Sequence, residues 1–127
     1  MYRHILIPTD GSKLAERGVV HGLALAKFVG AKVSAIYVVE PLLAVTGDFA
    51  SVLDRVANAA KEAGVSCGTI QVENVLPHEA IVAAAKDKGC DLIVMSSHGH
   101  SGLSAIVLGS VTNKVLAHTK TPVLVCQ

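Results

Sequence analysis

Apolar residues in this chain gather in short runs that alternate with longer segments of mixed character. The short runs are mostly rich in β-branched residues and have the length of buried strands. This pattern predicts five strands, at residues 4–7, 33–39, 69–72, 92–95 and 123–125.

The segments between these runs place apolar or small residues at helical spacing. This spacing predicts four helices, at residues 14–28, 49–63, 81–85 and 111–118. Gly30, Gly64 and Gly89 lie near the ends of the first three, where glycine often ends a helix. The one irregular stretch, residues 40–47, is expected to be a loop at the rim of the sheet.

Strands that alternate with helices favour right-handed crossovers and therefore a parallel sheet. We predict an α/β fold with a single doubly wound five-stranded parallel sheet, in the strand order 3-2-1-4-5, and with helices on both faces. Residues 1–127 are expected to form one domain.

Composition narrows the function classes. The chain is 51% hydrophobic but only 3% aromatic, which suits a core of Val, Ile, Leu and Ala under a parallel sheet. A net charge of +1 without a basic block argues against a nucleic-acid surface. Residues 1–7 are too short for a signal-peptide core or a spanning helix, so no membrane insertion is expected. The three cysteines, far apart and in no C-x-x-C pair, predict neither disulfides nor a zinc site and suit a cytoplasmic location.

Two polar segments follow predicted strands at the edge where doubly wound sheets bind ligands. Residues 8–12 (PTDGS) follow the first strand, and residues 96–102 (SSHGHSG) follow the fourth. Ligands of such sheets lie outside the carboxyl ends of the strands, where the strand order reverses. In the expected order these two loops flank one crevice.

The glycines of the second loop and the start of the last helix suggest an anion site. Glycine lets backbone approach an anion closely, and the free N–H groups of a helix start favour phosphate. We assign phosphate contact to Gly99, Gly109 and Ser110. The alternative is that these glycines only satisfy turn geometry.

Other residues near the crevice have two interpretations each. Asp10 could accept hydrogen bonds from a ribose or adenine, or could cap the first helix together with Ser12. The backbone of Val38 could pair with a purine edge, whereas its side chain and that of Met95 could equally belong to the core.

The histidines are weaker evidence for a binding site than the two loops. His98 and His100 have a spacing that metals sometimes use, but no third ligand is evident nearby, so His98 is better interpreted as a loop donor facing the ligand. The remaining histidines are expected at the surface or rim: His4, His21, His78 and His118.

Several catalytic motifs are missing from the sequence. It has neither a G-x-x-x-x-G-K-[ST] loop nor a G-x-G-x-x-G fingerprint, and residues 99–102 (GHSG) are one residue short of the G-x-S-x-G elbow. Because no triad or acid–base pair stands out, we predict a protein that is not an enzyme, with slow hydrolysis of a bound nucleotide at most.

Four motifs are spread over essentially the whole chain: ILIPTDGS, IYVVEP, VMSSHGHSGLSAIVLGSVTNKVL and TPVLVC. Together they resemble the universal stress protein family. ATP-binding members carry a Gly, two residues, Gly, nine residues, and then Gly with Ser or Thr. Gly99, Gly109 and Ser110 match this pattern, whereas Ser96 replaces the leading glycine.

The resemblance implies an adenine nucleotide α-hydrolase-like fold that binds ATP, with Mg or Mn on the phosphates. It implies that Asp10 and the Val38 backbone hold the adenosine end, beside Pro8 and Thr9. The phosphate end would be lined by Gly99, Gly109, Ser110, Val111 and Thr112. It further implies a homodimer that is joined through the last strand, residues 122–126.

Three functions compete at this stage. The first is a nucleotide-binding regulatory protein of stress physiology whose ATP occupancy changes the surface offered to a partner protein. The second is a dimeric interaction module with a vestigial pocket, which the serine at position 96 favours. The third is an enzyme that activates a substrate as an adenylate, which would need a substrate domain for which 127 residues leave no room.

Overall fold

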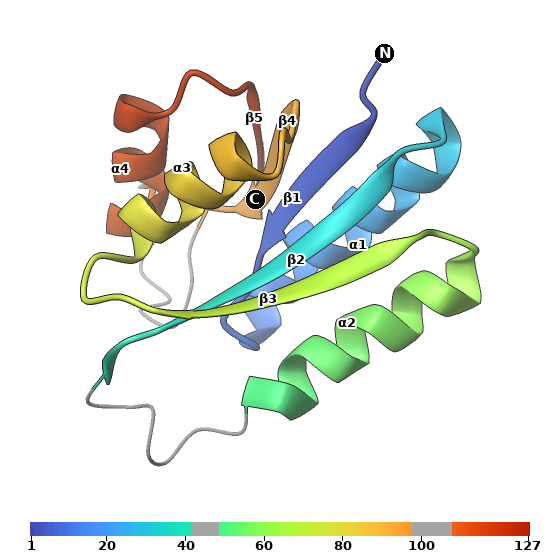
Figure 1. The fold of residues 1–127 in the computed structure, drawn as a ribbon, viewed down its shortest axis with the longest axis horizontal. Coiled ribbons are helices and arrows are strands. Elements are labelled where there is room, and N and C mark those ends of the chain that lie inside the picture. The colour runs from blue at the N-terminus through green and yellow to red at the C-terminus, as the bar shows by residue number, and fades with distance from the viewer. Residues whose placement is uncertain (42–48, 98–107) are drawn as a thin grey trace.

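The computed structural model describes residues 1–41, 49–97 and 108–127. Strands and helices alternate along the chain (Figure 1). The elements are β1 (His4–Pro8), α1 (Lys13–Val29), β2 (Lys32–Val39), α2 (Phe49–Ala63), β3 (Cys67–Glu73), α3 (Pro77–Asp87), β4 (Leu92–Ser96), α4 (Ser110–His118) and β5 (Val123–Cys126).

The strands form one five-stranded sheet in the order β3-β2-β1-β4-β5, and the neighbouring strands are parallel. This confirms the predicted fold class and strand order. The predicted element boundaries were less accurate. β3 and α3 are longer than their apolar cores suggested, because their ends carry small or polar residues that apolar periodicity does not detect.

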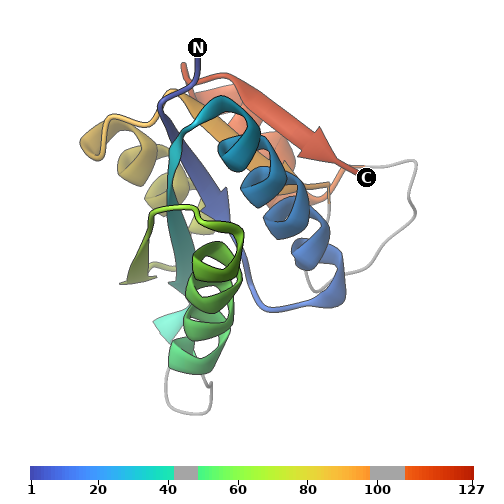
Figure 2. The same cartoon turned by 90° about the vertical axis from the view of Figure 1, so that its right-hand side faces the viewer.

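Two hydrophobic layers cover the sheet. On one face α1 and α2 pack against alternate strand residues such as Ile5, Ile7 and Val94. On the other face α3 and α4 pack against Leu6 and Ile93. Figures 1 and 2 show the two helix pairs on opposite sides of the strands. Side chains of the central strands are therefore buried on both faces, as expected for a doubly wound sheet.

Glycines at positions 18 and 22 bring α1 unusually close to the sheet. A Cβ atom added at Gly18 would lie 2.9 Å from the backbone nitrogen of Ser96 and 3.2 Å from the Cα of Met95. A Cβ added at Gly22 would overlap the Cδ1 atom of Ile7. The two glycines are one helical turn apart, so they form a face of α1 that fits directly against the strands.

One prediction about the histidines is wrong. His4 was expected at the surface or rim, but it is only 8% exposed. Its Nε2 atom lies 2.7 Å from the hydroxyl of Ser34, and its Nδ1 atom lies 3.1 Å from the carbonyl oxygen of Lys88. The reason is topological, because β1 becomes a central strand and its first residue is covered on both sides. Burial and the charge of Lys32 lower the pKa of His4.

In the described ranges, no helix is long and apolar enough to cross a membrane.

Candidate functional site

β1 and β4 separate at their carboxyl ends and open the edge of the sheet. Their pairing reaches only Leu6 and Ile93, although β1 continues to Pro8 and β4 continues to Ser96. The outer pairs stay in register, since β1 pairs with β2 up to Pro8 and β4 pairs with β5 up to Ser96. The sheet therefore divides where the strand order reverses, which is the ligand position in this type of fold.

The turn from β1 to α1 forms one wall of this opening. Gly11 has a φ of +79°, a left-handed conformation that other residues rarely adopt. The Gly11 amide donates to the Thr9 hydroxyl at 3.1 Å, and the Ser12 amide donates to Oδ1 of Asp10 at 2.9 Å. Ser12 in turn caps α1 by accepting from the Ala15 amide at 3.1 Å. Ser12 is thus the helix cap, and Asp10 holds the turn that positions it.

The start of α4 is tied to the end of β4 and forms the opposite wall. The Gly109 amide donates to the carbonyl oxygen of Ser97 at 2.7 Å. The buried hydroxyl of Thr112 donates to the carbonyl oxygens of Ser96 and Ser97, at 3.0 and 3.2 Å. These two donors are therefore already used in hydrogen bonds within the protein. A phosphate at Gly109 would approach its Cα rather than this N–H group.

The first-turn amides of α4 differ from the Gly109 amide. Gly109 is the N-cap, so Ser110, Val111 and Thr112 occupy the first three helical positions, whose N–H groups have no acceptor within the helix. Their dipoles add to the partial positive charge of the helix start. This first turn is an anion-attracting feature in the part of the site that the structure describes.

Val38 packs against the same hydrophobic layer that contains Met95, so both side chains belong to the core. Val38 is half-buried and lies two residues beyond Ile36, the last residue of β2 that pairs with β1. Its backbone edge toward β1 thus extends past the end of that strand. Met95 is buried in the hydrophobic layer beneath α3 and α4.

Two aromatic residues, one of them affected by the charge of Asp10, were missed in the sequence. The rings of Tyr37 and Phe49 meet edge to face, with centroids 5.0 Å apart. Burial, followed by the charge of Asp10, raises the pKa of Tyr37. The negative charge of the Asp10 carboxylate therefore disfavours ionisation of the Tyr37 phenol. A possible signal was the scarcity of aromatic residues, because two of the four Tyr and Phe side chains form this pair.

His98 and Gly99 were predicted to face the ligand, and both lie outside the described residues. So does His100, the other half of the possible metal spacing. The predicted convergence of this bend with the start of α4 therefore stays a prediction. The remaining predicted residues come from the ends of β1, β2 and β4 and from the first turn of α4.

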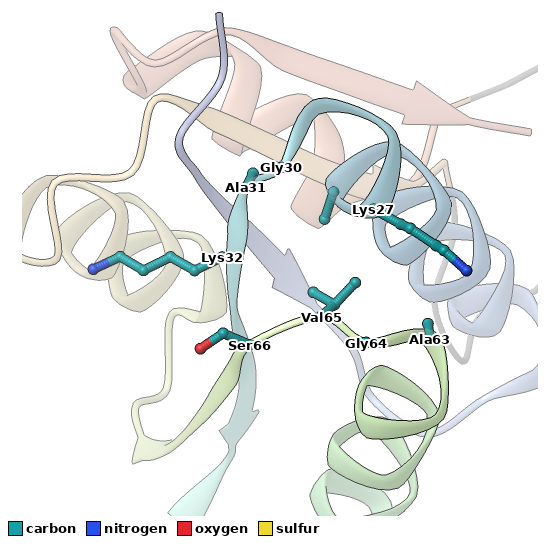
Figure 3. A pocket seen from close by; sticks show the side chains of 9 residues that line it. Lys27, Gly30, Ala31, Lys32, Ala63, Gly64, Val65 and Ser66 are labelled. Atoms are coloured by element: carbon teal, nitrogen blue, oxygen red, sulfur yellow. The ribbon is translucent and has the colours of Figure 1, made fainter.

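A cavity of about 350 Å³ lies at the other edge of the sheet. It lies where α1 and α2 end and where β2 and β3 begin, and it is lined by residues such as Lys27, Ala31 and Val65 (Figure 3). No predicted site residue lines it. Helix carboxyl ends carry partial negative charge and disfavour anions. This cavity is therefore a poor candidate for phosphate.

Comparison with known proteins gives a consistent result. A family model described as the universal stress protein family matches residues 1–127. The chain is 36% identical to universal stress protein MJ0531 of Methanocaldococcus jannaschii, over 98% of this chain and 82% of that protein. It is 30% identical to universal stress protein YxiE of Bacillus subtilis, over 98% of this chain and 99% of that protein.

Solved structures agree with the sequence comparison. The structure of MJ0577 of Methanocaldococcus jannaschii has a TM-score of 0.87 at 32% identity and covers 98% of this chain and 95% of its own. A universal stress protein solved in complex with cAMP has a TM-score of 0.82 at 28% identity. That alignment covers 99% of this chain and 97% of the other.

Proposed function

The chain belongs to the universal stress protein family, and from this premise we propose that it binds an adenine nucleotide between β1 and β4. The observation that carries the proposal is the separation of these strands beyond Leu6 and Ile93, with a helix start on one side and Asp10 on the other. ATP is the proposed ligand. A similar protein was solved with cAMP, which supports the adenine nucleotide class.

Each wall of the opening suits one end of the nucleotide. Asp10 and the backbone of Val38 would accept and donate hydrogen bonds at the ribose and adenine, with Pro8 and Thr9 behind them. The amides of Ser110, Val111 and Thr112 would face the phosphates. His98 and Gly99 are proposed to complete this end, and Ser96 and Met95 lie at the base, on the end of β4.

A divalent ion, Mg or Mn, is proposed to arrive on the phosphates rather than in a cage of its own. Magnesium usually keeps several waters and binds through phosphates and one or two carboxylates. In the part of the chain that the structure describes, no group of three or more His, Cys, Asp or Glu side chains could hold an ion without the nucleotide. The proposed ion would therefore be held by the phosphates and by water.

The wider role proposed is regulatory. The chain would act in the stress response, in the cytoplasm, as one nucleotide-binding domain without a catalytic constellation. Nucleotide occupancy would change the surface offered to a partner protein. The homodimer is proposed through β5, an edge strand on which Leu124 is 43% exposed. A strictly monomeric particle in small-angle scattering would contradict the dimer.

The site can be tested at Ser110, because one substitution removes its hydroxyl and another removes its amide donor. Ser110→Ala removes the hydroxyl only. Ser110→Pro also removes the N–H group, and proline is tolerated at the first helical position. The preceding Gly109 has φ −64° and ψ 158°, a conformation that a following proline allows.

Calorimetry with ATP and Mg should show binding to the wild type, little change in Ser110→Ala and at least about ten-fold weaker binding in Ser110→Pro. This magnitude is what the loss of one charge-assisted hydrogen bond produces. Gly109→Val should weaken binding by blocking the approach of a phosphate. Unchanged affinity in all three variants would remove the phosphate end from α4.

A second function has its own supporting observation. Thr112 and the Gly109 amide already bond to carbonyl oxygens at the end of β4, and Ser96 stands where the family pattern has glycine. A vestigial pocket in a dimeric interaction module would be expected to have such occupied donors and such a substituted glycine. A mass spectrum of the protein after mild purification, with thermal shifts on adding ATP, ADP, AMP or cAMP, separates the two. No bound nucleotide and no shift would favour the interaction module.

A further inference from the structure

Two histidines from different helices meet away from the proposed nucleotide site. The rings of His78 in α3 and His118 in α4 have centroids 5.1 Å apart and planes inclined by 40°. α3 and α4 lie side by side on one face of the sheet (Figure 1). The pair therefore joins the start of one helix to the end of the other.

The tautomer of His118 is fixed by its own helix. Its Nδ1 atom lies 2.7 Å from the carbonyl oxygen of Lys114. A carbonyl oxygen only accepts, so Nδ1 carries the proton and Nε2 holds the lone pair. Histidines that bind metals commonly donate their other ring N–H to a carbonyl in this way, which orients the ring and makes the free nitrogen a better ligand.

The separation of the rings fits a shared ion. Two imidazoles that bind one tetrahedral ion at about 2.0–2.1 Å have ring centres about 5 Å apart. His118 is exposed and His78 is partly exposed, so an ion can reach both rings from solvent.

We propose that His78 and His118 bind one divalent transition-metal ion that prefers imidazole nitrogen, of the zinc class. Among the described residues no three His, Cys, Asp or Glu side chains form a metal-binding group. The proposed site therefore has two protein ligands, and water would complete the coordination. With two protein ligands the site would be weaker than a structural zinc site with four. The ion would link the start of α3 to α4, whose first turn is the proposed phosphate end.

The experiment is a calorimetric titration of tag-free protein with zinc in a non-chelating buffer, without nucleotide. Wild type should bind one zinc per chain. His78→Ala and His118→Ala should each weaken binding at least ten-fold. The matched control is His21→Ala, because His21 is also exposed and also bonds a helix carbonyl through Nδ1, at 2.9 Å from Arg17, but pairs with no second described imidazole.

A second titration uses His98→Ala/His100→Ala, which removes the other histidine pair. Zinc affinity should be unchanged. The proposal is overturned if this double variant loses the site, if either single variant binds as wild type does, or if wild type does not bind zinc. In the last case the two rings only stack.

Fold integrity and the proposed function are measured separately. Circular dichroism should show that all variants are folded, and zinc should raise the melting temperature of wild type but not of His78→Ala. ATP binding with Mg in zinc-free buffer should be the same in wild type and His78→Ala. Failure of zinc binding and failure of nucleotide binding are therefore distinguishable.

Discussion

Replacing Gly18 by alanine tests how tightly α1 is held against the end of β4. The new Cβ would lie 2.9 Å from the backbone nitrogen of Ser96, and 3.1 and 3.2 Å from the carbonyl carbon and the Cα of Met95. All three neighbours are backbone atoms of a strand that pairs with β1 and β5. They can move only if the sheet or the whole helix shifts.

Two effects of opposite sign set the magnitude. Alanine is favoured over glycine inside a helix by about 1 kcal/mol. Extra atoms forced into a packed core cost about 1–3 kcal/mol, and a clash with strand backbone belongs near the upper end. The free energy of unfolding should therefore fall by about 2 kcal/mol, which lowers the melting temperature by about 8 °C in a domain of this size.

The assay is urea denaturation followed by circular dichroism at fixed protein concentration. Gly22→Ala is the matched comparison, because its new Cβ would meet the side chain of Ile7 rather than backbone. Ile7→Val removes the Cδ1 atom that makes the closest contact. Gly22→Ala/Ile7→Val should therefore be more stable than the two single effects add up to.

Gly18→Ala should also weaken nucleotide binding, because relief of the clash displaces Ser96 at the base of the proposed site. If Gly18→Ala is as stable as wild type or more stable, helix propensity outweighs the contact. The conclusion that this glycine is required for close packing would then be wrong.

Three further outcomes are expected. Thr112→Val should lower the free energy of unfolding by about 1–3 kcal/mol in urea denaturation, because the carbonyl oxygen of Ser96 loses a buried donor; an unchanged midpoint would mean that water replaces the hydroxyl. Stability should fall as the pH drops below about 6.5, because burial lowers the pKa of His4 and the unfolded chain then takes up a proton that the folded protein does not. Denaturation between about pH 7.5 and pH 5 should show that the free energy of unfolding depends less on pH in His4→Gln than in wild type. An equal dependence would contradict this assignment. Ser12→Ala should lower the free energy of unfolding by about 1 kcal/mol, because α1 loses its cap. A decrease below a few tenths of a kcal/mol in the same assay would argue against this capping role.

The sequence was informative wherever a local pattern has one physical outcome. Short β-branched runs that alternate with segments of helical spacing favour a covered parallel sheet, so element order and fold class followed from periodicity. Gly30 and Gly64 were recognised near helix ends because a helix often ends in a left-handed residue, which glycine suits. Both are left-handed in the structure, with φ of +76° at each. The prediction of a ligand site at the loops after β1 and β4 rests on topology, because ligands of doubly wound sheets bind where the strand order reverses.

Contacts between distant segments could not be predicted in the same way. His4 reads as a polar residue near the chain start, and only its place between β2 and β4 explains why it is buried against Ser34. Likewise the pairing of His78 with His118 depends on how two helices pack, since the residues are far apart in the chain.

The sequence by itself thus determined the order and kind of elements, and it predicts a ligand at one edge of the sheet. The tertiary structure decided which donors are already used there, such as the Gly109 amide, and how closely α1 approaches β4 at Gly18. The physical reason is that periodicity and turn chemistry act over a few neighbouring residues. Hydrogen-bond pairing and close packing depend instead on groups that folding brings together from separate parts of the chain.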